Sequence, residues 1–428
     1  MIDRLRKTLR FLGSLGWSVA PPNATRTQRH NFLNAQLEGL GVGLAMSAGP
    51  FISVLLTRLG ATSTQVGLLS SLPGVAGIGL AIVAGRFLQA RRNIVPWFSR
   101  LRLIALSAYT FTGLAPFFVP ERYLVTSILV IWALAAIPQT FMSVAFSLVM
   151  NGIAGPKGRY DLMSRRWSIL GVTQAVMIAL AGWVLDQISF PLNYQLVFLV
   201  LSLGGVISFS FSRRIELPDQ DPPRHTHGAG IRHAFTSTLG LVRAHPEFIS
   251  FVSRRLVYLA GGLLGTPLFT LYFVRVLGAS DSWIGAINTA NTAVLLIGYS
   301  IWARQARTRG SRFVLFWTTL GLALYPVAVA VTRWTPAIVL YAALAGVFSA
   351  GINLVFFDLL MRTVPEDQNA TFVAIDQSLQ YIITVLMPII GTILADQIGI
   401  AGALLVSGGL RLIGWALMVR YDPGPSKP

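Results

Sequence analysis

One carboxylate lies inside the first long apolar run of the chain. Glu38 follows Asn31 by seven residues and Asn34 by four, so the three side chains share one face of a helix. An ionisable group is costly inside hydrocarbon and is therefore a candidate for function. Two roles are open: Glu38 could bind and release a proton or another cation, or it could form an ion pair. Arg255 is the candidate partner, because it lies 217 residues further on, at the offset of an internal repeat.

A second set of charged residues lies close to the ends of three other apolar runs. Its members are Arg165, Arg166, Asp358 and Asp376. At an offset of 210, Arg166 maps onto Asp376, so the pair could join two related halves and hold the cytosolic side shut. The alternative is that the arginines only mark the cytosolic side and that Asp376 only favours the N-terminus of a helix.

Uncharged polar residues near the middle of the apolar runs form a third set. Such residues either line a substrate cavity between two halves or join helices by hydrogen bonds worth about 0.6 kcal/mol each. For the set as a whole we favour the cavity. The candidates are Gln139, Gln174, Thr266, Asn288, Asn291, Asn353, Gln380 and Tyr381.

The repeat that links these sets is visible in two stretches. Residues 50–67 read PFISVLLTRLGATSTQVG, and residues 267–285 read PLFTLYFVRVLGASDSWIG. Pro50 and Arg58 recur at an offset of 217, and Gly60, Ala61 and Gly67 recur at 218. The tripeptide Asp-Gln-Ile at 186–188 recurs at 396–398. Because these offsets are close to half of 428 residues, the chain is predicted to contain two copies of one unit.

The composition places these elements in a membrane. Hydrophobic residues make up 54% of the chain and charged residues 12%, and apolar runs of about 20 residues recur throughout. A net charge of +18 would suggest nucleic acid for a soluble chain, but here the positive charges lie in alternate connections between apolar runs. We find no nucleophile–base pair, phosphate loop or metal-ligand spacing. The sequence therefore predicts no enzyme, no cofactor, no metal site and no nucleic-acid partner.

An all-α membrane protein with twelve transmembrane helices is predicted, arranged as two six-helix bundles related by a pseudo-two-fold axis along the membrane normal. The expected helices are 31–57, 65–86, 99–119, 123–150, 165–186 and 192–212 in the first bundle, and 249–275, 282–303, 312–332, 337–361, 371–396 and 400–420 in the second. The bundles correspond to domains 31–212 and 249–420. An N-tail at 1–30 with an amphipathic helix, a polar linker at 213–248 and a C-tail at 421–428 complete the chain.

The distribution of lysine and arginine predicts the orientation. With both termini in the cytosol, 29 of the 34 basic residues fall on the cytosolic side and 4 on the outer side. We therefore expect an integral protein of the cytoplasmic (inner) membrane. Each half has an even number of helices, so the two halves are parallel repeats.

This organisation resembles the major facilitator superfamily over about residues 31–420. The basic loop after the second helix, residues 85–92, keeps Gly85 and the basic cluster of the superfamily's loop signature, but Gln89 replaces its aspartate. The drug–proton antiporters of this superfamily carry an arginine in the fourth helix and a Gly-Pro pair in the fifth. Both are missing here, which argues against that subfamily.

The resemblance implies a secondary active transporter that moves a small organic solute by alternating access, with protons as a candidate coupling ion and a monomer as the expected unit. Two alternatives remain open: a membrane protein of the same fold that acts in assembly or sensing, and a translocator of lipids or amphiphiles. The polar set is rich in amides and poor in fixed charge, which favours neutral, zwitterionic or amphipathic substrates over multiply charged ones.

Overall fold

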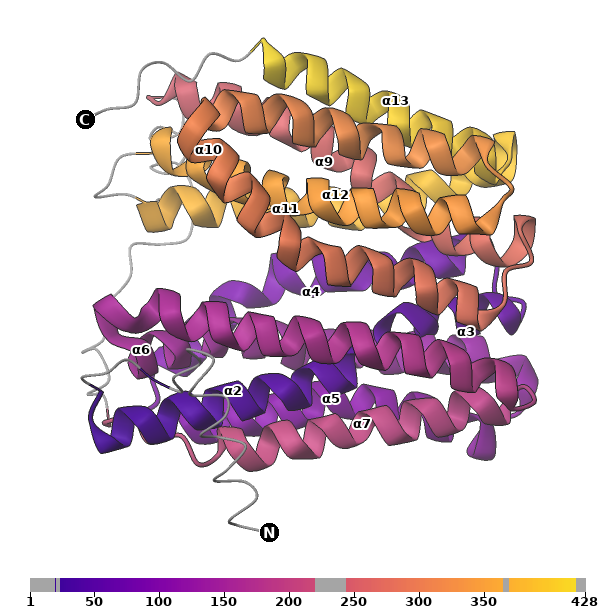
Figure 1. Cartoon of the computed structure of the whole chain (residues 1–428). Helices are drawn as coiled ribbons and strands as arrows, with labels where there is room; N and C mark the ends of the chain where they lie inside the picture. Colours follow the sequence, from indigo (N-terminus) through magenta and orange to yellow (C-terminus); the bar gives the residue numbers. More distant parts are fainter. Residues whose placement is uncertain (1–19, 21–23, 220–243, 365–368, 421–428) are drawn as a thin grey trace.

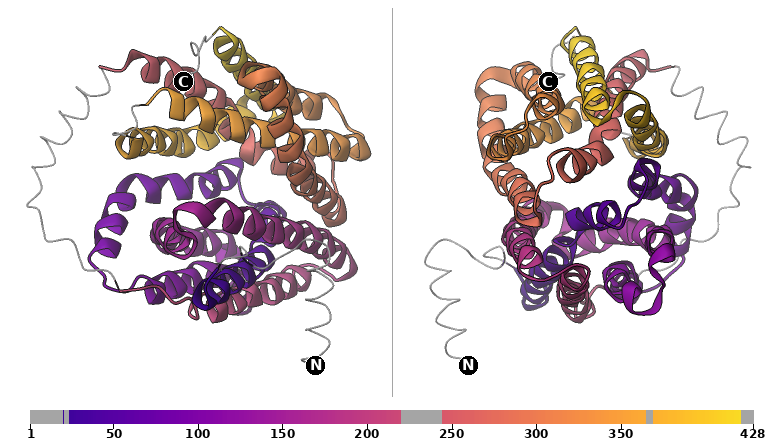
Figure 2. Two further views of the ribbon diagram at one scale, coloured as in Figure 1. Left: turned by 60° about the vertical axis from the view of Figure 1, so that its left-hand side comes forward. Right: turned by 90° about the vertical axis from the view of Figure 1, so that its right-hand side faces the viewer.

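The computed structural model describes residue 20 and residues 24–219, 244–364 and 369–420, and every regular element in these ranges is a helix. The helices before residue 213 lie in the lower part of Figure 1 and those after residue 245 in the upper part, and the same division is visible from two other sides in Figure 2. The predicted amphipathic helix in 1–30, most of the linker and the C-tail lie outside the described residues. The elements are α2 (Arg26–Met46), α3 (Gly49–Arg58), α4 (Ser63–Gln89), α5 (Val95–Phe118), α6 (Glu121–Gln187), α7 (Leu192–Ser212), α9 (Pro246–Leu271), the π-helical turn η1 (Tyr272–Val276), α10 (Asp281–Val331), α11 (Thr335–Arg362), α12 (Asn369–Ile398) and α13 (Ile400–Val419).

The first predicted helix is broken into two pieces. α2 ends at Met46 and α3 begins at Gly49, because Pro50 has no amide hydrogen to bond Met46 and thus interrupts the helical ladder. In the second half, Pro267 lies inside α9, which runs on without a gap into η1. The two copies of the repeated stretch therefore share their sequence pattern but bend differently.

Two long elements each contain two of the predicted helices. α6 covers the predicted helices 123–150 and 165–186, and its membrane-length apolar stretches are Glu121–Ala154 and Leu162–Gln187. Ile128 and Leu185 lie in one core cluster, whereas a straight helix would hold them about 85 Å apart, so the chain reverses between them. α10 covers 282–303 and 312–332 and breaks at Gly310, whose φ of 83° suits a residue without a Cβ.

Ten helices or helix pairs in the described part of the chain are long and apolar enough to cross a membrane. The protein is therefore an integral membrane protein with an all-helical fold.

The hydrophobic core consists of three clusters of buried residues. The residues in each cluster show where the two halves of the chain meet. One cluster is built by both halves and includes Phe51 and Ile128 from the first and Leu268 and Leu404 from the second. A second contains only residues of 248–418, and a third contains only residues of 20–215. The halves therefore share a packed core at one end and have separate cores at the other. The separate cores lie at the end of the molecule where α2 begins and α13 ends, on the left of Figure 1.

Close backbone approach at the joined end depends on two glycines. Gly182 of α6 lies against Gly285 of α10, and a Cβ atom at Gly182 would stand 2.7 Å from the carbonyl oxygen of Asp281. Larger side chains would push these helices apart, so this crossing requires glycine in both halves.

Candidate functional site

The two copies of the repeated stretch bind one another at the joined end. Nη2 of Arg58 donates to the carbonyl oxygen of Ala279 at 3.2 Å, and Nη2 of Arg275 donates to the carbonyl oxygen of Ala61. Since the two arginines and the two alanines are equivalent positions of the repeat, each copy holds the other by the same contact. Nη1 of Arg275 also donates to Oγ of Ser63 at 3.1 Å.

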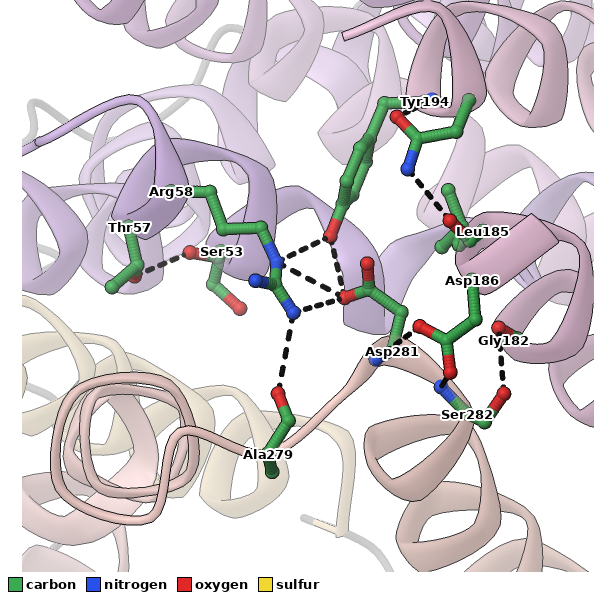
Figure 3. A network of polar contacts seen from close by, with 11 residues as sticks. Ser53, Thr57, Arg58, Gly182, Leu185, Asp186, Tyr194, Ala279, Asp281 and Ser282 are labelled. Atoms are coloured by element: carbon green, nitrogen blue, oxygen red, sulfur yellow. Dashed lines mark hydrogen bonds and ion pairs between the residues drawn. The ribbon is translucent and has the colours of Figure 1, made fainter. Parts of the chain in front are cut away.

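A charged pair strengthens one of these two contacts (Figure 3). Asp281, the residue equivalent to Ser63, places Oδ1 2.9 Å from Nη2 and 3.2 Å from Nε of Arg58. The hydroxyl of Tyr194 donates to the same oxygen at 2.7 Å. Only 6% of the Asp281 side chain is exposed, so loss of Arg58 would leave the Asp281 carboxylate buried without a counter-charge. We call Arg58, Tyr194, Asp281 and Arg275 the closing network.

Asp186 fixes the start of α10 beside this network. Its carboxylate accepts the backbone amides of Asp281 at 2.9 Å and Ser282 at 3.0 Å, which satisfies two amides that the helix leaves free and places negative charge at its N-terminus. The equivalent Asp396 is exposed. The equivalent helix α4 has instead a capping box of Thr62 and Gln65.

A cavity of about 320 Å³ lies between the halves next to the closing network. Ser53 and Thr270, which are 217 residues apart and equivalent in the repeat, meet there with their hydroxyl oxygens 3.1 Å apart. We call this space the central cavity, because equivalent residues of the two halves meet in it. Its lining is formed by Pro50, Ser53, Ser70, Thr266, Pro267, Phe269, Thr270, Phe273, Ile284, Ile287, Asn288, Asn291, Tyr325 and Ala342.

Three of the eight predicted cavity residues line this space. Thr266 is exposed, and its hydroxyl donates to the carbonyl of Gly262. Asn288 donates to Ile284 within its own helix, whereas Asn291 donates to Ala342 and thereby joins α10 to α11. Sequence reasoning missed Ser53, Ser70, Thr270 and Tyr325, although the 217-residue offset relates Ser53 to Thr270.

The other five predicted cavity residues are placed elsewhere. Gln139 and Gln174 are half-buried on α6. Asn353 bonds the hydroxyl of Tyr299 at 3.2 Å, and Gln380 bonds Asp376 at 2.7 Å. The ring of Tyr381 packs where Gly77 of α4 leaves room for it. Asn353 and Tyr381 thus join neighbouring helices, whereas Gln380 bonds within its own helix.

Glu38 is fully buried inside the first half, and its predicted pairing with Arg255 is wrong. Its oxygens lie 2.9 Å from Nη2 of Arg102 on α5 and 2.8 Å from Nη2 of Arg166 on α6, and Ser208 of α7 donates to it at 3.3 Å. The carboxylate thus ties four helices of one half together instead of bridging the halves. Sequence reasoning counted Arg102 among the cytosolic loop charges, and its place inside an apolar run was the overlooked signal.

Arg255 and Asp376 form the corresponding pair of the second half. Nη1 of Arg255 lies 2.6 Å from Oδ1 of Asp376. Arg166 and Asp376 therefore do not contact each other in this structure, since each is paired within its own half. Asp358 bonds Ser311 and Arg362 near the end of α11, and Arg165 is half-buried on α6.

The two buried pairs are related by the repeat with their signs exchanged. Glu38 and Arg255 are equivalent at an offset of 217, and Arg166 and Asp376 are equivalent at 210. In each half, therefore, the first helix and the fifth helix of the repeat carry opposite charges that neutralise one another. Within the described ranges, no group of three or more histidine, aspartate or glutamate side chains lies close enough together to hold a metal ion.

Comparison with known proteins agrees with this geometry. Residues 256–428 match the family model of the Major Facilitator Superfamily. The fold is similar to that of a bacterial homologue of the iron transporter ferroportin in an inward-facing state, with 16% identity over 92% of this chain and 98% of that one and a TM-score of 0.66. It is also similar to a bacterial homologue of the human lysosomal transporter Spinster, inward-facing and unoccupied, with 14% identity over 93% and 97% of the chains and a TM-score of 0.68.

A D-xylose–proton symporter is similar at 13% identity over 92% and 98% of the chains, with a TM-score of 0.68. No curated protein sequence matches the chain. The resemblance to the major facilitator superfamily is thereby confirmed: the second half carries the superfamily's sequence pattern, and the whole chain has the fold of its transporters. The matched residues of the second half and the fold of the whole chain are therefore similar to those of transporters of this superfamily.

Proposed function

We propose that the protein moves a small polar organic solute across the cytoplasmic membrane by alternating access. The observation that carries this proposal is the central cavity, to which the first half contributes hydroxyl groups and the second half hydroxyl and amide groups. Transporters built from such repeats place their substrate at the interface of the halves, near the middle of the membrane. One chain supplies every lining residue named above, so a monomer is the proposed working unit.

The proposed architecture is twelve spans in two six-helix domains, 31–212 and 249–420, related by a pseudo-two-fold axis. This number of spans is obtained when α2 and α3 count as one span and α4 as another. α6 and α10 then count as two spans each, because the chain reverses within them. The Ser53–Thr270 contact supports the axis. With the termini in the cytosol, the closing network lies on the outer side and the separate cores on the inner side, which is an inward-facing arrangement. Closure of the cytosolic side by Arg165, Arg166, Asp358 and Asp376 stays a prediction for the opposite state.

The orientation can be tested with a single cysteine, because the chain has none of its own. A cysteine replacing Ser426 is expected to resist a membrane-impermeant thiol reagent added to intact cells and to react after the cells are opened. A cysteine replacing Glu121, at the exposed start of α6, is the matched control and should react from outside. Reaction of the Ser426 variant in intact cells would overturn the proposed topology.

Binding in the cavity can be tested by ligand-induced thermal stabilisation of the purified protein. A solute at a hundred times its Kd is expected to add about 2.7 kcal/mol to the stability of the folded state. Asn288→Ala should weaken this effect by about tenfold in apparent affinity, because Asn288 bonds only its own helix and its side-chain oxygen is available to the solute.

The control is Asn353→Ala, since Asn353 bonds Tyr299 away from the cavity and its loss should leave ligand affinity unchanged. A panel of solutes that stabilises neither the parent protein nor any variant would favour an assembly or sensing role over transport. Equal effects of the two alanine variants would remove Asn288 from the site.

A second candidate, translocation of an amphiphile, is favoured by an apolar groove beside the cavity. The groove has a volume of about 280 Å³ and is lined by side chains such as Trp317, Leu324 and Phe348. Tyr325 lines both the groove and the central cavity, so a polar head in the cavity and an apolar tail in the groove would lie on either side of one side chain. Alkyl derivatives belong in the same thermal panel, and stabilisation that grows with chain length would select this candidate.

The buried charges do not suggest Glu38 as a coupling group. Both of its oxygens contact guanidinium groups, and Ser208 donates a further hydrogen bond. A carboxylate that exchanges protons during transport requires access to water in one state, whereas Glu38 has no exposed surface. We therefore propose that Glu38 has a structural role. Any proton coupling would then use other ionisable groups.

A further inference from the structure

Arg411 is a cation in the middle of the last apolar helix, α13. It is half-buried, and no carboxylate pairs with it among the residues that the structure describes. The buried arginines Arg102, Arg166 and Arg255 each contact a carboxylate: Arg255 pairs with Asp376, and Arg102 and Arg166 share Glu38. An unmatched charge inside a membrane protein is costly and calls for a functional explanation.

The structure holds Arg411 in place with partners that leave its charge uncompensated. Pro326 has no amide hydrogen, so the carbonyl of Leu322, four residues earlier in α10, lacks its helical partner. Nη1 of Arg411 donates to this carbonyl at 2.8 Å. The guanidinium carbon also lies 5.5 Å from the centre of the Tyr258 ring, and Nε has no hydrogen-bond partner.

Arg411 contacts two helices that line the central cavity, α9 and α10. A Cβ atom at Gly262 would collide with Nη2 of Arg411, so this nitrogen rests directly on the backbone of α9. Gly262 precedes the cavity residue Thr266 by four positions, and Leu322 precedes the cavity residue Tyr325 by three. The two terminal nitrogens of the guanidinium thus contact residues that lie about one helical turn along the chain from cavity-lining residues, on two different helices.

We propose that Arg411 binds an anionic group of the transported solute, a carboxylate or a phosphate. This inference rests on the proposed function and names the class of substrate for the same cavity. A guanidinium forms strong, paired hydrogen bonds with either group. The hydroxyl and amide groups of Ser53, Thr266 and Asn288 then contact the uncharged part of the solute. Because a single guanidinium binds one such group, we expect the solute to carry one carboxylate or one phosphate.

The test uses the full-length protein in nanodiscs of neutral lipid and a broad panel of monocarboxylates and phosphate monoesters. Each acid is paired with its uncharged analogue, for example lactate with lactamide and glycerol 3-phosphate with glycerol. We expect thermal stabilisation by acids, either carboxylates or phosphates, and none by their partners. Arg411→Gln should weaken the acid's apparent affinity at least tenfold, whereas Arg411→Lys, which keeps the charge, should retain most of it.

Arg362→Gln is the matched control, because Arg362 pairs with Asp358 away from the cavity and its loss should leave acid binding unchanged. Arg411→Gln keeps a side-chain donor for the carbonyl of Leu322, and Arg411→Lys provides a second variant if the first folds poorly. Equal stabilisation by acids and amides, undiminished in Arg411→Gln, would overturn the anion site and leave the proposed transport function standing. Stabilisation by no member of either class would overturn both.

Discussion

Replacing Glu38 with glutamine is expected to leave little folded protein. The substitution removes the only acid that faces Arg102 and Arg166 in the described part of the first half, so two guanidinium groups stay buried without a counter-charge. Breaking a buried ion pair in this way costs about 3–5 kcal/mol, which is a large part of a typical total stability of about 5–15 kcal/mol. The measurement is the yield of monodisperse protein and its melting temperature in detergent.

Double variants identify which arginine is the partner of Glu38. Glu38→Gln combined with Arg102→Gln removes one of the two guanidinium groups that lost their counter-charge and should recover part of the lost stability. Combination with Arg255→Gln should not rescue, because Arg255 belongs to the other half and pairs with Asp376. Glu121→Gln, an exposed acid, serves as the single-site control. Rescue by Arg255→Gln, with none by Arg102→Gln, would contradict the observed pairing.

Replacing Asp281 with asparagine is expected to open the joined end. Asp281 accepts hydrogen bonds from both Arg58 and Tyr194, and only in the joined arrangement do these residues of the first half reach it. Weakening the closing network destabilises the state in which this end is joined, relative to the state in which it is open. A change of about 1.4 kcal/mol in the free-energy difference between the two states shifts the ratio of their populations tenfold. The shift should favour the state in which the cavity faces the outer side.

The shift can be read from a cysteine at Ser53, which lines the cavity behind the closing network. In the parent protein an impermeant thiol reagent added outside should react slowly with this cysteine, and Asp281→Asn should raise the rate by about tenfold, if the reacting state is the minor one. Glu121→Gln is the matched control, since it removes an exposed acid that belongs to neither the closing network nor the predicted cytosolic gate. An unchanged rate in Asp281→Asn, or an equal rise in Glu121→Gln, would show that the closing network does not hold this end shut.

Several features of this protein follow from the sequence alone. The apolar runs are long enough to cross a bilayer only as helices, because backbone groups in hydrocarbon must bond within their own segment. The repeat of residues 50–67 at 267–285 predicted that the two halves are built alike, and Gly60 and Gly278 both have positive φ in the structure. Three of the eight predicted cavity residues, Thr266, Asn288 and Asn291, line the central cavity.

The partners of the buried charges were decided only by the tertiary structure. A repeat offset finds equivalent positions, but it does not say which of them touch. Ser53 and Thr270 lie where the halves meet and contact each other. Glu38 and Arg255 are each buried within their own half, so their charged partners lie on neighbouring helices of the same half. Which helices are neighbours depends on packing, and no spacing along the chain contains that information.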